Sequence, residues 1–203
     1  MIKPKLCDKK VAQTLLANFP TMVLASNSAN RTALLEEIGI KVIKRPQDIL
    51  EFCDKTTPEE VVKELALNKL QSYLSSKEFN PALPSLSADT LVFNDDTLTG
   101  KPKDREDAFN TLLSFSNKTQ LILSGFALYI PNREIINKTD ITTVKFKTLT
   151  PKIVNAYLDT EEWIGAAGSY KIQKNGYTLI EKMTGSWSNA IGLSLELLSS
   201  SIL

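Results

Sequence analysis

The turn after the first apolar run of the chain carries side chains suited to binding phosphate. Ser26 and Ser28 follow this run, and Arg31 comes three residues later, before an amphipathic segment that stops at Gly39. This order predicts a strand that leads into a helix, with Ser28 as the helix N-cap. A helix N-terminus offers free N–H groups and partial positive charge, and hydroxyls and a guanidinium add further donors. We therefore expect this turn to bind phosphate, although the glycine-rich P-loop motif is absent.

Two further positions place a charged side chain in a setting that suggests a role. Asp89 lies in an otherwise apolar strand expected at 86–93, where a carboxylate is costly to bury unless it is paired or binds a metal ion. The alternative is a carboxylate that caps the strand end in solvent. Lys101 lies in a tight turn between Gly100 and Pro102, from which its ammonium group can point at an anion. The alternative there is an ordinary surface lysine.

Three weaker candidates lie elsewhere in the chain. Glu51 is a lone acid near the end of an extended segment, and Lys69 lies in the apolar pattern of a helix, from which it either reaches the surface or contacts a phosphate. Gln173 is a neutral amide in a glycine-flanked loop, and such a group can read a base edge or orient a water molecule. Hard cations such as Mg²⁺ bind carboxylates and phosphate oxygens. The residues alone therefore lead to a phosphate-ester enzyme or a nucleotide-binding module.

Composition excludes several classes of protein. The 203 residues carry a net charge of +1, which gives no support to binding of nucleic acid or of an anionic membrane. The chain has no histidine, so a Ser-His-Asp triad, a Cys-His pair and histidine-ligated zinc are excluded. The two cysteines, Cys7 and Cys53, fit no metal-binding spacing and are expected as free thiols. Any catalysis must use carboxylates, lysines, hydroxyls or a metal ion held by oxygen ligands.

The apolar segments also bear on the compartment. No signal-peptide pattern is visible at the N-terminus, and no apolar run approaches the ~20 residues that span a bilayer. We therefore expect a cytoplasmic protein without a membrane partner.

Apolar periodicity and turn residues predict a mixed α/β fold. Strands and helices alternate early, and two long strands with a short connection, at 119–130 and 134–147, predict an antiparallel hairpin. The sheet is therefore expected to be mixed. Helices are expected at 9–18, 29–38, 57–73, 104–115, 150–158 and 190–198, and the other strands at 22–26, 40–44, 86–93, 97–99 and 177–183.

Taken in order, these segments resemble the Maf family of nucleoside triphosphate pyrophosphatases over about residues 22–198. No single motif is decisive, but their common order is specific. The matching segments are Leu24 to Leu35, Glu51, Leu65-Ala66 with Lys69, Ala88-Asp89-Thr90, Gly100-Lys101-Pro102, Ser124-Gly125, Thr143 with Phe146, Glu162, Ala167 to Tyr170, Ile172-Gln173, Gly185 to Asn189 and Gly192-Leu193.

The resemblance implies a fold and a reaction. The fold is an α/β fold with a mixed twisted sheet, shared with inosine triphosphate pyrophosphatases: an elongated, two-lobed single domain at 21–203 with a central cleft, after a lead-in segment at 1–20. The reaction is hydrolysis of a nucleoside triphosphate between the α and β phosphates, which gives a monophosphate and pyrophosphate. Ala88-Asp89-Thr90 and Ile172-Gln173 are more similar to the subgroup that acts on dTTP and UTP than to the one that acts on methylated GTP and CTP.

The resemblance also implies roles for the residues that bind the substrate. Ser26, Ser28 and Arg31 would bind the phosphate tail. Asn30 stands beside them where the family has an arginine. Gln173 would read the base or position the attacking water.

For the chemical step, the resemblance implies two lysines and two carboxylates. Lys69 and Lys101 would neutralise charge that builds up on the phosphates. Asp89 would activate water or bind a divalent metal ion, Mg²⁺, Mn²⁺ or Co²⁺, with Glu51 as the second metal ligand.

Departures from the family pattern leave other functions open. Asn30 replaces one loop cation, and Gly165-Ala166 replaces a charged pair. Such losses are compatible with a catalytically weakened nucleotide sensor of the same fold. A sugar- or acyl-phosphate phosphatase is a third reading, without a motif of its own. Family members often pair as homodimers, which leaves the oligomeric state open.

Overall fold

The computed structural model describes residues 5–49, 53–94 and 97–203. These residues form two compact units. The larger one, here called the Arg31 unit, comprises Lys5–Thr90, Leu123–Asp140 and Ser186–Leu203. The smaller one, here called the Lys101 unit, comprises Leu91–Ile122 and Ile141–Gly185.

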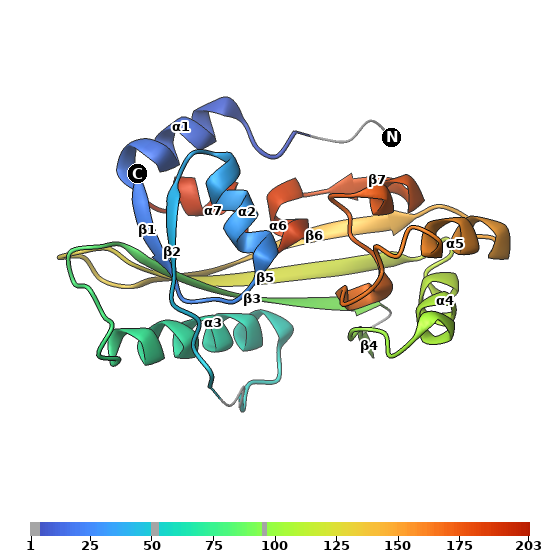
Figure 1. The fold of residues 1–203 in the computed structure, drawn as a ribbon, viewed down its shortest axis with the longest axis horizontal. Helices are drawn as coiled ribbons and strands as arrows, with labels where there is room; N and C mark the ends of the chain where they lie inside the picture. Colours follow the sequence, from blue (N-terminus) through green and yellow to red (C-terminus); the bar gives the residue numbers. More distant parts are fainter. Residues whose placement is uncertain (1–4, 50–52, 95–96) are drawn as a thin grey trace. The chain divides into compact units, whose positions relative to one another are not determined.

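The chain alternates helices and strands in its first half, as expected, and Figure 1 labels each of them. The helices of the Arg31 unit are α1 (Lys9–Asn18), α2 (Ala29–Glu37), α3 (Pro58–Leu74), α6 (Trp187–Ile191) and α7 (Leu195–Ser200). Those of the Lys101 unit are α4 (Arg105–Ser114) and α5 (Pro151–Leu158), with 3₁₀ turns η1 (Ala167–Ser169) and η2 (Asn175–Leu179). The strands are β1 (Thr21–Leu24), β2 (Lys41–Lys44), β3 (Ser85–Asn94), β4 (Thr97–Leu98), β5 (Thr119–Tyr129), β6 (Ile136–Phe146) and β7 (Ile180–Thr184).

The sheet is mixed, which confirms the prediction. Over the described residues the strand order is β2-β1-β3-β5-β6-β7, and β4 pairs with the end of β3. Strand β1 is parallel to β2 and β3, whereas β4 and β7 are antiparallel to β3 and β6. Strands β5 and β6 are neighbours joined only by residues 130–135, which is too short for a parallel crossover. These two strands are therefore the expected hairpin.

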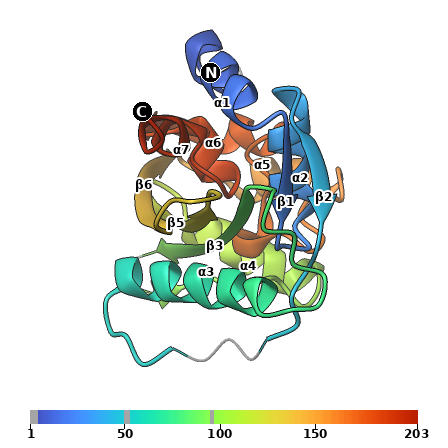
Figure 2. The same ribbon diagram turned by 90° about the vertical axis from the view of Figure 1, so that its left-hand side faces the viewer.

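In the Arg31 unit, helices cover both faces of the strands. Figure 2 shows α3 on one face and α2, α6 and α7 on the other. Side chains of β1 alternate between these layers: Met22 and Leu24 pack with the apolar side chains of α2 and α7, whereas Val23 packs with Tyr73 of α3. The lead-in helix α1 joins the same core through Leu15. Burial on both faces explains why the sequence of β1 is a continuous apolar run and does not alternate with polar residues.

The Lys101 unit has an aromatic core. The ring of Phe146 in β6 lies 5.1 Å from that of Phe115 and 5.2 Å from that of Tyr170, measured between ring centroids. Helix α4 packs against α5 and η1. This core fixes the ends of α4 and η1, which lie beside the turn that carries Lys101.

Two predictions for the last third of the chain are wrong. The single helix expected at 190–198 is instead α6 and α7, separated at Gly192, whose φ of +128° is not helical. The strand expected at 177–183 begins only at Ile180, because η2 occupies the preceding residues and sheet pairing starts where Ile180 meets Phe146.

The structure bears on two expectations from composition among the described residues. Cys7 and Cys53 are both free thiols. None of the helices combines the length and the apolar character that crossing a bilayer requires.

Candidate active site

The turn after β1 is built as its sequence predicts. Ser28 caps α2, because its Oγ accepts a hydrogen bond of 3.4 Å from the backbone N–H of Arg31. Ser26 closes the turn before the helix, and its Oγ accepts from the backbone N–H of Ser28 at 3.2 Å. Asn30 lies exposed in the first turn of α2. The two serines thus shape the backbone that presents Arg31.

The guanidinium of Arg31 is held by neutral oxygens from three parts of the chain. Nη1 donates to Ser26 Oγ at 3.1 Å, Nη2 donates to Thr90 Oγ1 at 3.0 Å, and Nε donates to the carbonyl of Gly192 at 2.9 Å. Only 9% of the residue is exposed. These three acceptors carry no charge, and together they orient the planar guanidinium. An oriented guanidinium can bind an anion through its N–H groups.

The hydroxyl of Ser26 is prepared to donate to that anion. Its oxygen already accepts two hydrogen bonds, from Ser28 and Arg31. Within the described residues the structure gives its own proton no acceptor. A hydroxyl that accepts from a cation is a better donor, because hydrogen bonds in a chain polarise one another. We expect a phosphate oxygen to fill this position.

A second polar group in the same unit is the ion pair of Lys69 and Asp89. Nζ of Lys69 in α3 lies 2.6 Å from Oδ1 of Asp89 in β3, and the two side chains are only 13% and 12% exposed. Asp89 is therefore paired inside the protein and does not cap the strand in solvent. Lys69 does not merely reach the surface, since it contacts this carboxylate. Within the described residues, Oδ2 of Asp89 has no donor.

The pairing follows from how closely α3 packs on the sheet. Ser87, two residues before Asp89 on the same face of β3, donates from Oγ to the carbonyl of Ala66 at 2.5 Å. Ala66 lies one helical turn before Lys69. Gly125 in β5 permits the close approach, since a Cβ there would come within 2.4 Å of the Val62 carbonyl. Helix α3 is thereby fixed with Lys69 opposite Asp89.

The two groups lie on opposite faces of β3, beyond the end of β1. Consecutive strand residues point to opposite faces, so Asp89 faces α3 while Thr90 faces α2 and α6. Pairing of β1 with β3 ends where Leu24 meets Leu86. Residues 89 and 90 therefore lie past the carboxyl end of β1, which is where ligands bind in open α/β sheets. A ligand at this edge can approach both groups.

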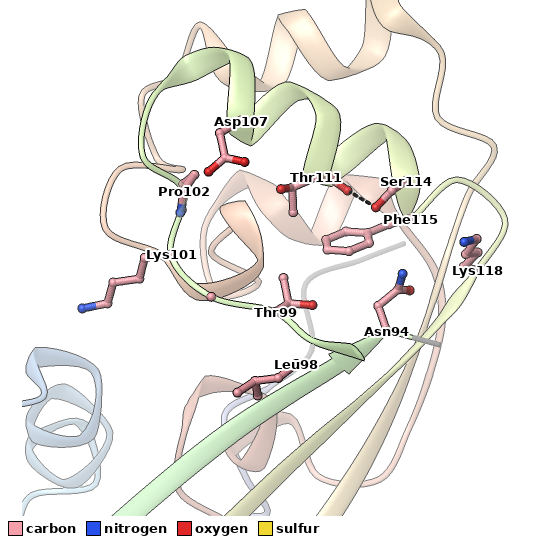
Figure 3. Close-up of a pocket in the computed structure, with 11 residues that line it drawn as sticks. Asn94, Leu98, Thr99, Lys101, Pro102, Asp107, Thr111, Ser114, Phe115 and Lys118 are labelled. Atoms are coloured by element: carbon pink, nitrogen blue, oxygen red, sulfur yellow. Dashed lines mark hydrogen bonds between the residues drawn. The ribbon is translucent and has the colours of Figure 1, made fainter. Parts of the chain in front are cut away.

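Lys101 belongs to the other compact unit. It is exposed, and its turn is tied down by the hydrogen bond of 3.0 Å from the N–H of Gly168 to the carbonyl of Gly100. Figure 3 shows the side chain pointing away from Thr111 and Phe115, which line a cavity of about 410 Å³ between this turn and α4. Lys101 forms no ion pair or hydrogen bond with any described residue. Both expectations for Lys101, an anion contact and an ordinary surface lysine, are compatible with this exposed position.

Gln173 is half-buried in the same unit, between η1 and η2. Two buried tyrosines fix its loop. The hydroxyl of Tyr157 accepts from the backbone N–H of Lys171 at 3.0 Å, and Tyr170 donates to Oε1 of Gln120 at 3.0 Å. Desolvation by burial raises the pKa of both phenols, so both stay neutral. The loop is a fixed support for Gln173.

The described residues offer little to a preformed metal site. Glu51, the expected second ligand, lies outside them. Among the residues that the structure does describe, no three acidic or sulfur-bearing side chains cluster. Asp89 is a carboxylate with one oxygen beside Lys69, which fits an ion held mainly by substrate phosphates plus one protein carboxylate.

The sequence assigned no role to three groups around Arg31, which together with Arg31 and Ser26 are here called the Arg31 cluster. Thr90 and Ser124 lie within hydrogen-bond distance of one another, and Gly192 supplies a carbonyl to Arg31. The sequence could have pointed to Thr90, because this residue directly follows Asp89. Nothing local to Ser124 or Gly192 indicates their place beside an arginine far away in the chain.

Comparison with known proteins gives relatives along most of the chain. A dTTP/UTP pyrophosphatase from Thermosipho melanesiensis is 36% identical over 175 residues, which are 86% of this chain and 92% of that protein. A dTTP/UTP pyrophosphatase from Fusobacterium nucleatum is 34% identical over 176 residues, 86% of this chain and 90% of that protein.

A structural comparison and a family comparison agree with these sequence relatives. The structure of the Staphylococcus aureus Ham1 protein matches 90% of this chain and 97% of its own with a TM-score of 0.50, at 12% identity, which shows a shared fold. The model of the family described as Maf-like protein matches residues 21–202. This chain therefore belongs to the Maf-like protein family.

Proposed function

We propose that this protein hydrolyses nucleoside triphosphates between the α and β phosphates, with dTTP and UTP as preferred substrates. The observation that carries the proposal is the oriented, buried guanidinium of Arg31 at the same sheet edge as the Lys69–Asp89 pair. A fixed cation beside a donor hydroxyl suits a phosphate tail, and a carboxylate with one unengaged oxygen suits the handling of a proton. The names of the two relatives support the base preference.

Each group has a defined task in this scheme. Arg31 and Ser26 bind the phosphate tail. Oδ2 of Asp89 accepts the proton of the attacking water, while Lys69, 2.6 Å from Oδ1, fixes the carboxylate and offsets charge on the phosphates. Lys101, with its exposed ammonium group, would neutralise charge that builds up on the phosphates.

A divalent cation, Mg²⁺, Mn²⁺ or Co²⁺, belongs to the proposal, with Glu51 as a predicted direct ligand and Asp89 linked to the ion through the attacking water, whose proton Oδ2 accepts. When bound, such an ion polarises phosphoryl oxygens and lowers the pKa of a coordinated water. Gln173 would contact the base. The cytoplasm as the compartment and a homodimer as the assembly complete the proposal.

The first experiment measures pyrophosphate release from a panel of common and modified nucleoside triphosphates with each of the three metal ions. We expect turnover with dTTP and UTP. Release of orthophosphate instead would indicate a phosphatase. Binding without any product would indicate the nucleotide sensor, and would contradict the proposed activity.

Asp89→Asn tests the assignment of the base. The substitution keeps the size of the side chain but removes its ability to take a proton, so we expect the turnover number to fall by about 10³-fold. Asp54→Asn is the matched control, because Asp54 is an exposed carboxylate whose ion pair among the described residues is with its neighbour Lys55. Turnover by Asp89→Asn within threefold of the control would show that Asp89 is not the base.

A further inference from the structure

We propose that Thr90 is a positioning residue, which sets the orientation of Arg31 through a directed chain of hydrogen bonds that ends on the backbone of α6. This inference rests on the proposed function for the role of Arg31, but its first test measures binding of an inorganic anion and needs no turnover. Thr90 is half-buried in β3, directly after Asp89. Its hydroxyl lies within hydrogen-bond distance of Arg31, Ser124 and the Gly192 carbonyl.

Counting protons fixes the direction of the chain. Arginine only donates hydrogen bonds, and a backbone carbonyl only accepts them. Nη2 of Arg31 donates to Thr90 at 3.0 Å, and Ser124 donates to the carbonyl of Asn189 at 3.2 Å. With the Ser124 proton on Asn189, the Thr90 proton goes to Ser124 at 3.0 Å in preference to the Gly192 carbonyl at 3.3 Å. All bonds therefore run from the guanidinium toward α6.

The far end of the chain is rigid. Helix α6 is anchored to α7 because Ser186 and Ser188 both donate to Oε2 of Glu196, at 2.5 and 2.7 Å. Asn189, the last acceptor, is fully buried in this helix. Hydrogen bonds in series polarise one another, so a fixed acceptor at one end strengthens the bond from Arg31 at the other.

The same helix fixes the second nitrogen of the guanidinium. Gly192, at the end of α6, has a φ of +128°, and its carbonyl accepts from Nε of Arg31 at 2.9 Å. The longer contact of Thr90 with this carbonyl, 3.3 Å, competes for the same Thr90 proton. Thr90 and Gly192 thus hold two edges of one planar group, and this leaves the guanidinium little freedom to rotate.

The position of Thr90 explains why a hydroxyl is needed there. Asp89 and Thr90 are consecutive, so one strand segment holds the carboxylate on one face and orients the cation on the other. Removing the hydroxyl would leave Asp89 and Lys69 in place while the terminal nitrogen of Arg31 loses its support. The expected defect is in binding the phosphate tail, not in the chemical step.

Thr90→Val tests this, because valine has nearly the same shape and no hydroxyl. The probe is inorganic tripolyphosphate, with its affinity measured by calorimetry. We expect binding about tenfold weaker than wild type. Thr90→Ser, which keeps the hydroxyl, should bind as wild type does. Thr139→Val is the matched control, since Thr139 donates to the Glu59 carbonyl at 3.2 Å on the surface of the same unit.

The kinetic readout separates positioning from a loss of structure. With the preferred nucleotide, Thr90→Val should raise KM about tenfold and leave kcat within about twofold, because the lost interaction serves ground state and transition state alike. If Thr90→Val does not fold, the inference is tested with Ser124→Ala in the calorimetric assay. We expect this variant to bind tripolyphosphate about threefold more weakly than wild type.

Tripolyphosphate binding equal to wild type in Thr90→Val, or in Ser124→Ala when that variant decides, overturns the inference. Absence of binding by the wild type overturns it as well. Binding that weakens as expected in a protein without turnover would support the role of Thr90 and contradict only the proposed hydrolysis.

Discussion

The Arg31 cluster and the Lys69–Asp89 pair place a buried cation in two different environments on the two faces of β3. Arg31 contacts three neutral oxygens, whereas Lys69 contacts a carboxylate. The three contacts of the first environment orient the guanidinium, and this suits the binding of an anion. The second largely balances its charge within the protein, so it suits proton handling. In the proposed function, one strand thus serves binding on one face and chemistry on the other.

The two groups also depend on different parts of the chain. The acceptors of Arg31 come from the turn after β1, from β3 and from the end of α6. The pair depends on the packing of α3 against β3 and β5. Changes in α6 should therefore affect anion binding, and changes in α3 should affect the carboxylate.

The largest effect is expected from Lys69→Met, which leaves the buried carboxylate of Asp89 without this cation. We expect the free energy of unfolding to fall by about 3 kcal/mol, since an uncompensated buried charge is strongly destabilising. Urea denaturation measures the loss. The double variant Lys69→Met/Asp89→Asn should recover most of it, because the charge is then absent. If the free energy of unfolding of the single variant falls by less than about 1 kcal/mol, Lys69 does not compensate a buried charge on Asp89.

Arg31→Lys should have an intermediate effect. A lysine keeps the charge but has one nitrogen in place of a planar fork, so it cannot satisfy Ser26, Thr90 and Gly192 together. We expect a stability loss of about 1–2 kcal/mol and an increase in KM of about tenfold. Arg45→Lys, at an exposed pair with Glu78, is the control and should change stability by less than about 0.5 kcal/mol. Equal effects of the two substitutions would contradict the orientation of Arg31 by its acceptors.

The smallest effect is expected from Ser87→Ala, which removes the hydrogen bond to the Ala66 carbonyl. A single buried hydrogen bond contributes about 1 kcal/mol, and we expect a stability loss of that size. The measurement is the shift of the urea midpoint, with Ser200→Ala, at an exposed helix end, as control. Affinity for tripolyphosphate should not change, since Ser87 lies on the α3 face. Weaker anion binding would mean that the two faces are coupled.

Local features were predictable because neighbouring residues cause them. The N-cap at Ser28 and the proline starts of α3 and α5 follow from backbone geometry within a few residues. The long helix expected at 190–198 failed for a non-local reason. Gly192 breaks it with a positive φ, and its carbonyl there contacts Arg31, 161 residues away.

The sequence by itself determined the mixed α/β class, the order of the elements, and the types of side chain for which we propose phosphate binding, because periodicity and spacing are local properties. Only the tertiary structure decided that Lys69 faces Asp89 and that Thr90, Ser124 and the end of α6 surround Arg31. Both arrangements depend on close packing between distant segments, through Gly125 against Val62 and Ser87 against Ala66 for the pair, and through α6 for the cluster. Such approaches are set by the shape of the whole core, which no short stretch of sequence encodes.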